Sequence, residues 1–196
     1  MMPQWSRLGG NFDNNVVRAL HKRLQQEHSV LALNFRGVGG SDGRTSFTGA
    51  GEREDALDAC RYAAESLGAK RIATVGYSFG ALVGCSVINE GSNVVASCGV
   101  SYPFGVSRWL SLWNTSALQE PLNGPQPKLQ VIGTQDNFTS VATWEARVAQ
   151  FPNTETRVFD GVDHFWGSTS ELNELCETIV PWCRQVLGES EGTTTH

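Results

Sequence analysis

Gly76-Tyr77-Ser78-Phe79-Gly80 is the stretch of this chain that decides the fold. It follows the apolar run Arg71 to Val75 and opens the small-residue segment Ala81 to Glu90, which predicts strand, tight turn and helix in that order. A serine on such a turn has a strained backbone, and glycines flank it because a Cβ there would collide with neighbouring backbone. The hydroxyl is pushed out above the end of the strand. The amide of Phe79, at the helix N-terminus, is predicted to point towards a developing oxyanion.

A serine nucleophile needs a base, and the histidines of this chain are His21, His28, His164 and His196. His21 and His28 belong to an early amphipathic helix, and His196 is the last residue of a polar tail. His164 remains as the predicted base, on a loop that follows the strand-like run Glu155 to Phe159.

The predicted acid is Asp136, because it follows the apolar run Lys128 to Ile132 at the carboxyl end of another strand. Asp136 could instead cap the helix that follows it. Asp160 and Asp163 compete for the role, but Asp163 is adjacent to His164 in sequence and would reach the imidazole poorly. The order Ser78, Asp136, His164 has separations of 58 (136 − 78) and 28 (164 − 136) residues.

Four segments together resemble a small, lidless α/β-hydrolase, and the order Ser, Asp, His is the one found in that family. They are Asn34 to Gly43, Gly76 to Gly80, Gly133 to Asp136 and Asp163 to Trp166. The chain is most similar to the dienelactone-hydrolase-like group of alpha/beta-superfamily hydrolases, over roughly residues 9 to 187. True dienelactone hydrolases carry a cysteine nucleophile, whereas this chain has Ser78. The resemblance therefore implies a serine hydrolase and leaves the substrate open.

The predicted fold is α/β, with a doubly wound, mostly parallel sheet flanked by helices in one domain, residues 1–187, followed by a disordered tail, 188–196. The expected strands are Val30 to Phe35, Arg71 to Val75, Val95 to Ser101, Lys128 to Ile132 and Glu155 to Phe159. The first expected helix begins near Asn11 or Asp13. The others cover Glu52 to Leu67, Phe79 to Asn89, Val141 to Phe151, and Glu171 to Leu187, the last with a kink at Pro181.

The start of the chain departs from the family pattern. The resemblance implies a strand before the first helix, placed in the sheet between Val30 to Phe35 and Arg71 to Val75, whose following loop gives a second oxyanion amide. Only Met1 to Leu8 is available for this strand, and Pro3 makes it a poor one. Either Gln4 to Leu8 forms a short strand, or the chain begins at an internal methionine of a longer protein, and we then expect marginal stability.

Composition excludes several classes of function. The chain has 196 residues, 40% of them hydrophobic, and a formal net charge of −5, which gives no electrostatic footprint for nucleic acid or an anionic membrane. No apolar run is long enough for a membrane span, and Met1 to Gly10 lacks the features of a signal peptide, so a cytoplasmic location is predicted. The five cysteines form no Cys-x-x-Cys pair and are expected to be reduced.

Two further segments are predicted to lie near the site. The glycines in Arg36 to Gly43 do not have the spacing of a dinucleotide-binding fingerprint, so a tight loop near the site is preferred. The irregular stretch Pro103 to Pro127 is predicted to be a flap or a short helix beside the site. An apolar acyl pocket is predicted from aromatic residues, about half of which could equally be core: Phe104, Trp109, Trp113, Phe165 and Trp166.

These residues predict a serine hydrolase of esterase or thioesterase type, acting on a small carboxylic ester or related acyl substrate without a metal or organic cofactor. The alternative is a catalytically weak binding or scaffold protein built on the same fold, because a fold does not fix a function.

Overall fold

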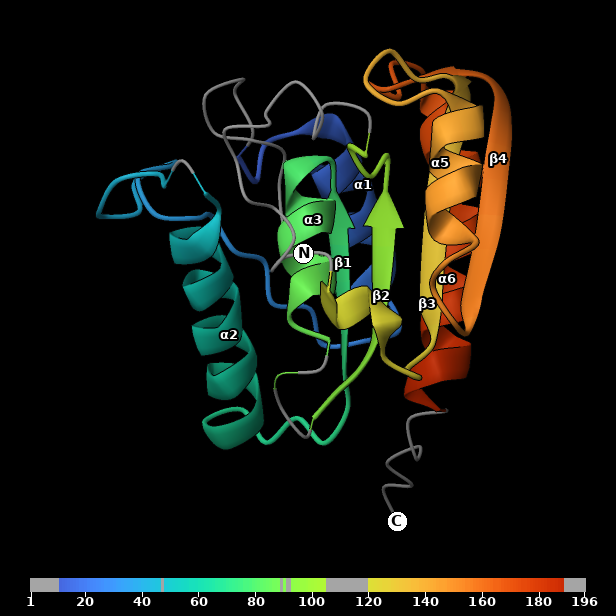
Figure 1. Cartoon of the computed structure of the whole chain (residues 1–196). Coiled ribbons are helices and arrows are strands. Elements are labelled where there is room, and N and C mark those ends of the chain that lie inside the picture. Colours follow the sequence, from blue (N-terminus) through green and yellow to red (C-terminus); the bar gives the residue numbers. More distant parts are fainter. Residues whose placement is uncertain (1–10, 47, 89, 91–92, 105–119, 189–196) are drawn as a thin grey trace.

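The computed structural model describes residues 11–46, 48–88, 90, 93–104 and 120–188 (Figure 1). In chain order, the helices and strands are α1 Asn15–Leu24, α2 Ala50–Glu65, β1 Ile72–Tyr77, α3 Phe79–Ser86, β2 Val94–Val100, the 3-10 helix η3 Glu120–Asn123, β3 Lys128–Gln135, α5 Val141–Val148, β4 Thr154–Asp163 and α6 Thr169–Leu187.

The described strands form one parallel sheet in the order β1-β2-β3-β4. Helices α1 and α6 cover one face of this sheet, and α2, α3 and α5 cover the other (Figure 1). Each face has its own hydrophobic core, one built around Trp166 and Ile179 and the other around Phe35 and Trp144. This arrangement confirms the predicted α/β class.

The helix signals in the sequence are largely confirmed. Helix α1 buries the predicted stripe Val16, Val17, Leu20 and Leu24, and its cap is Asn14, whose side chain accepts hydrogen bonds from the amides of Val16 and Val17. Helix α6 begins with a capping box between Ser168 and Glu171 and continues through Pro181 to Leu187.

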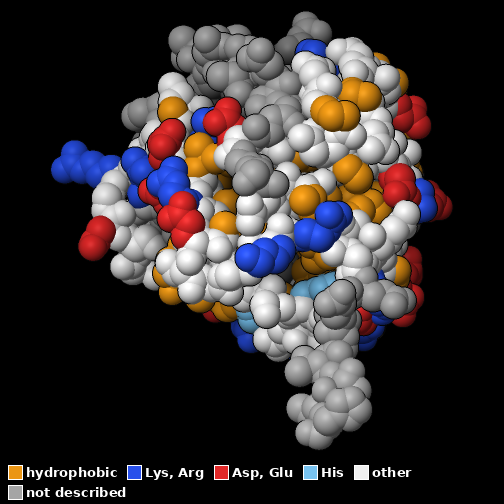
Figure 2. All heavy atoms as spheres, turned by 90° about the horizontal axis from the view of Figure 1, so that it is seen from below, with side chains coloured by type: hydrophobic (Ala, Val, Ile, Leu, Met, Phe, Trp, Pro, Cys, Tyr) orange, Lys and Arg blue, Asp and Glu red, His pale blue; other side chains and the backbone are white. Residues whose placement is uncertain are grey.

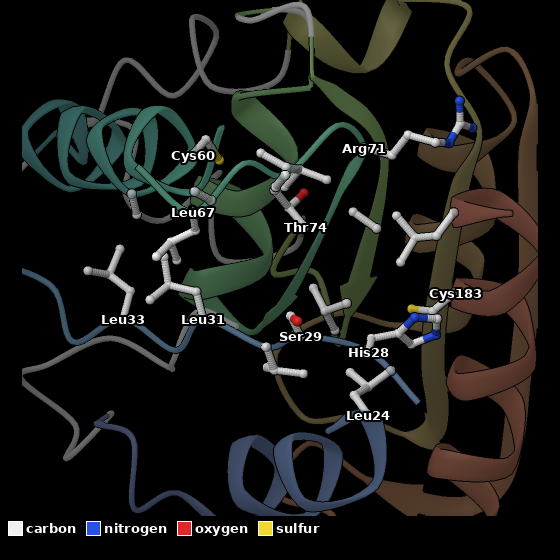
Figure 3. Close-up of a pocket in the computed structure, with 18 of the residues that line it drawn as sticks. Leu24, His28, Ser29, Leu31, Leu33, Cys60, Leu67, Arg71, Thr74 and Cys183 are labelled. Atoms are coloured by element: carbon white, nitrogen blue, oxygen red, sulfur yellow. The ribbon is translucent and has the colours of Figure 1, made fainter. Parts of the chain in front are cut away.

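The predicted strand Val30 to Phe35 is wrong, because the structure assigns no strand there. An extended apolar run becomes a strand only when its backbone pairs with a neighbour. In the described part of the chain, β1 pairs with β2 alone. A cavity of about 660 Å³ lies between residues 29–33 and β1 instead (Figure 3).

This cavity follows the edge of β1. Its lining includes the consecutive residues 72–75 of β1, whereas a pocket on one face of a strand would be lined by alternate residues. Side chains of α1 and α6 close it on one side and side chains of α2 on the other. Seen from the end where the strands begin, hydrophobic side chains are visible between charged ones in the middle of the molecule (Figure 2). The strand predicted in residues 1–8 lies outside the described residues.

Strand β4 contains an irregularity that positions the site. Between the pairs Gly133↔Phe159 and Gln135↔Asp163, β3 advances by two residues while β4 advances by four. Gly161 has φ +72°, a conformation that favours glycine. Extra residues of this kind bend a strand and increase its local twist. The carboxyl end of β4 is therefore redirected before it reaches His164.

The structure bears on the remaining predictions to different extents. The loop Arg36 to Gly43 is tight, with positive φ at Gly37, Gly39, Gly40 and Gly43. Most of the predicted flap, residues 105–119, and the tail 189–196 lie outside the described residues. No helix in the described part of the chain is both long enough and apolar enough to cross a membrane.

Candidate active site

The structure brings Ser78, Asp136 and His164 together at the carboxyl ends of the strands. Ser78 directly follows β1, Asp136 follows β3 and His164 follows β4. The Nε2 atom of His164 lies 2.9 Å from Ser78 Oγ, and its Nδ1 atom lies 2.8 Å from Asp136 Oδ2. These distances are those of hydrogen bonds, so the three side chains form one continuous chain of polar contacts.

Ser78 stands on the sharp turn that the sequence predicts. Its φ of 54° and ψ of −121° are uncommon for a residue other than glycine. A Cβ on Gly76 would lie 2.0 Å from the carbonyl oxygen of Gly80, so no side chain fits at position 76. Phe79 is the first residue of α3, and its amide belongs to the group that has no acceptor within the helix.

The carboxylate of Asp136 is held by both oxygens. Oδ2 faces His164, while Oδ1 accepts hydrogen bonds from the amides of Phe138 at 2.9 Å and Thr139 at 3.0 Å. The side chains of His164 and Asp136 are each only 1% exposed. Helix α5 is capped by Ser140, so Asp136 does not serve as its cap. The carboxylate therefore has a fixed orientation towards the imidazole.

The carboxylates of Asp160 and Asp163 form hydrogen bonds with groups other than His164. Asp160 accepts a hydrogen bond from the hydroxyl of Thr134 at 3.1 Å. Asp163 accepts from the amides of Phe165 at 2.8 Å and Trp166 at 3.2 Å, which closes the turn after His164. The geometry thus singles out Asp136 as the partner of His164.

Four hydrogen bonds that the sequence analysis missed hold the loop of His164. The hydroxyl of Tyr77 donates to the carbonyl oxygen of His164 at 2.8 Å, and Trp166 Nε1 donates to Ser101 Oγ at 3.1 Å. Asn15 of α1 donates to two further carbonyl oxygens in the same loop. Tyr77 lies inside the segment Gly76 to Gly80, which is itself a signal that it lies near the site. No sequence pattern marks Asn15 or Ser101.

Aromatic rings surround the imidazole. Phe138 lies 4.2 Å from His164 between ring centroids, Phe165 lies 5.7 Å away, and Tyr77 lies 5.6 Å away. Phe165 is 47% exposed, so it presents an apolar surface beside the site. Phe138 was not singled out from the sequence, although it stands only two residues after Asp136.

The aromatic residues predicted to line an acyl pocket have different positions. Phe104 is 2% exposed and stacks on Tyr102, and Trp166 is fully buried in the core beneath α6. Both occupy core positions, which is the alternative that the sequence left open. Trp109 and Trp113 lie outside the described residues, as does the second oxyanion amide predicted near Leu8 to Gly10. The cavity beside β1 is lined by none of the three site residues.

Burial affects the ionisation of the groups around the site. Burial, together with the charges of Asp136 and Asp163, raises the pKa of Tyr77 well above its usual value. Its hydroxyl therefore stays protonated and remains a donor. Within the described residues, no group of three or more His, Cys, Asp or Glu side chains is arranged to hold a metal ion.

This fold and this site place the chain in the alpha/beta hydrolase fold family. The model of that family matches residues 8–99. An alpha-beta serine hydrolase homologue from Coxiella burnetii is 30% identical, with a TM-score of 0.74, over 91% of this chain and 81% of that one. An uncharacterized protein of Rickettsia prowazekii, RP471, is 27% identical over 87% of this chain and 74% of its own length.

Two more distant structures show the same fold. XC6422 from Xanthomonas campestris, an a/b serine hydrolase without a lid, has a TM-score of 0.74 at 21% identity, over 94% of this chain and 79% of that one. The esterase Pf2001 of Pyrococcus furiosus has a TM-score of 0.72 at 22% identity, over 88% and 77% of the two chains.

Proposed function

We propose that this protein is a serine hydrolase of esterase or thioesterase type that acts on a small carboxylic ester or related acyl substrate. The observation that carries the proposal is the pair of contacts on one imidazole, to Ser78 Oγ at 2.9 Å and to Asp136 Oδ2 at 2.8 Å. The names of two structural neighbours, a serine hydrolase homologue and an esterase, support it. Membership of the dienelactone-hydrolase-like group and a cytoplasmic location remain predictions.

The geometry suits a two-step acyl transfer. As Ser78 Oγ attacks the substrate carbonyl, His164 Nε2 takes the hydroxyl proton, and Asp136 orients the imidazole and stabilises its charged form. His164 then protonates the leaving group, so an acyl-enzyme remains on Ser78. Water, activated by the same imidazole, releases the acid and regenerates the serine.

The developing oxyanion needs hydrogen-bond donors that are already in place. The amide of Phe79 stands at the N-terminus of α3, where the helix leaves its first amides unpaired and partly positive. It is the proposed oxyanion donor among the described residues. Removing one such donor typically costs about 10²- to 10³-fold in rate.

Reaction with a fluorophosphonate probe tests the proposal. The intact protein should be labelled on Ser78, and Ser78→Ala should abolish labelling and lower hydrolysis of a short p-nitrophenyl ester at least about a thousandfold. The variant's circular dichroism and melting temperature provide the control for folding. An intact, folded protein that neither reacts with the probe nor hydrolyses the ester would favour the alternative, a binding or scaffold protein.

A further inference from the structure

The serine and the histidine of the proposed site come from the two outermost strands of the described sheet. β1 and β4 are separated by β2 and β3. Three strand spacings of about 4.8 Å amount to roughly 14 Å, much more than the reach of a histidine side chain. The 2.9 Å contact between Nε2 and Ser78 Oγ therefore requires the carboxyl end of β4, whose Asp163 still pairs with Gln135 of β3, to turn back over the ends of the strands towards β1.

The crossing segment is held at successive strands. Over β2, Trp166 Nε1 donates to Ser101 Oγ. At β1, Tyr77 Oη donates to the backbone oxygen of His164 itself at 2.8 Å. Of these two contacts, only the one from Tyr77 links His164 directly to the residue that precedes Ser78.

Tyr77 is built to hold this position. It is 1% exposed, and its neighbour Ser78 has a backbone conformation fixed by the close approach of Gly76 and Gly80. The ring also packs beside the imidazole, with centroids 5.6 Å apart. A buried ring between fixed neighbours has few alternative rotamers, so the position of its hydroxyl is well defined.

We propose that Tyr77 is a positioning residue, whose hydroxyl sets the distance between the imidazole of His164 and the hydroxyl of Ser78 by binding the carbonyl oxygen of His164. Its contribution to catalysis rests on the proposed function, whereas its effect on the imidazole does not. A displacement of about 1 Å in a reacting group can cost about 10²-fold in rate. Loss of the hydroxyl therefore lowers turnover and leaves substrate binding largely intact.

Tyr77→Phe is the test, because it removes the hydroxyl and keeps the ring. Tyr102→Phe is the matched control: Tyr102 is also fully buried, and its hydroxyl has no hydrogen-bond partner among the described residues. With a p-nitrophenyl ester, we expect Tyr77→Phe to lower kcat about 10- to 100-fold with KM changed less than about twofold. Tyr102→Phe should leave both constants and the melting temperature close to those of the unmodified protein.

A second measurement does not need a substrate. The proton on His164 Nδ1 that faces Asp136 should give a far-downfield NMR signal, assigned by its absence in His164→Gln. We expect Tyr77→Phe to broaden or remove this signal and Tyr102→Phe to retain it. If the unmodified protein lacks esterase activity but shows this difference, the proposed function fails and the positioning role stands.

Two results would overturn the inference. One is a Tyr77→Phe protein with the signal and the kcat of the unmodified protein. The other is an equal loss in Tyr77→Phe and Tyr102→Phe, which would show a general effect of removing a buried hydroxyl.

Discussion

Gly133 on β3 lies directly against Val162 on β4: a Cβ on Gly133 would stand 2.1 Å from the carbonyl oxygen of Val162. The contact falls at the irregularity where β4 gains two residues on β3. The absence of a side chain at Gly133 is thus what allows β4 to approach and turn towards the site. His164 follows only two residues after Val162.

We expect Gly133→Ala to move Val162, since the atom that the new Cβ would meet is a backbone oxygen and cannot rotate away. The proposed esterase activity should fall at least about tenfold, because His164 is carried on the displaced segment. Gly167→Ala is the control, because an added Cβ there has no heavy atom within 4 Å. Equal activity and equal melting temperatures of the two variants would contradict this account.

A second prediction separates the candidate acids. Asp136→Asn removes the charge beside His164 Nδ1, so the imidazolium formed during acyl transfer loses its stabilisation and the ring loses its oriented tautomer. We expect kcat to fall at least about a hundredfold, measured with a p-nitrophenyl ester. Asp160→Asn should change it less than about twofold, because the carboxylate of Asp160 accepts a hydrogen bond from Thr134 and not from His164. The reverse order of effects would assign the acid to Asp160.

The sequence was sufficient for the local part of the site. Ser78 lies between a strand and a helix that are both marked by hydrophobic pattern and glycines, and Asp136 and His164 follow strands that can be recognised in the same way. The crossing of the His164 loop could not be predicted, because it depends on which strands are neighbours. Contacts such as Tyr77 to His164 join residues 87 positions apart and leave no periodic signal.

The failed strand has a related cause. Val30 to Phe35 has the composition of a buried strand, but composition does not supply the neighbour that a strand must pair with. In the described structure the space next to these residues is the cavity along β1. Local pattern therefore overestimated regular structure where a partner strand would be required.

A third prediction concerns alkaline pH. Burial raises the pKa of Cys85 to about 11 and that of Cys183 to about 12, from a usual value of 9.0. The unfolded chain therefore loses thiol protons that the folded chain keeps, so the contribution of these thiols to stability is constant below about pH 8 and falls between about pH 9 and 11. Each such thiol contributes a slope of up to about 1.4 kcal/mol per pH unit.

Urea unfolding at several pH values measures this slope. Cys85→Ser replaces the thiol with a group that does not ionise in this range. The slope of the unfolding free energy against pH should therefore become shallower, whatever change the substitution makes to the urea midpoint at pH 7. A free energy of unfolding that stays flat from pH 8 to 10.5 in the unmodified protein would contradict the prediction.

The last prediction concerns the edge of β1 beside the cavity. The amides of Ile72 and Ser78 donate to Asn93 and Val100 on the side of β2. Because successive amides of a strand point to opposite edges, those of Ala73 and Val75 point towards the cavity. We expect these two amides to exchange with deuterium faster than those of Ile72 and Thr74, which serve as internal controls on the same strand.

Filling the cavity should remove this difference in exchange rate. An apolar segment of about eight residues, supplied as a separate peptide, is long enough to run beside residues 72–75 and pair with them. Each buried amide that gains a partner avoids a cost of about 1 to 3 kcal/mol, so the melting temperature should rise by several degrees and the esterase activity with it. The same segment with proline at alternate positions cannot supply the paired donors and should have no effect. Slow exchange of Ala73 and Val75 in the chain without the addition would mean that both amides are already paired, and the expectation of marginal stability would then be wrong.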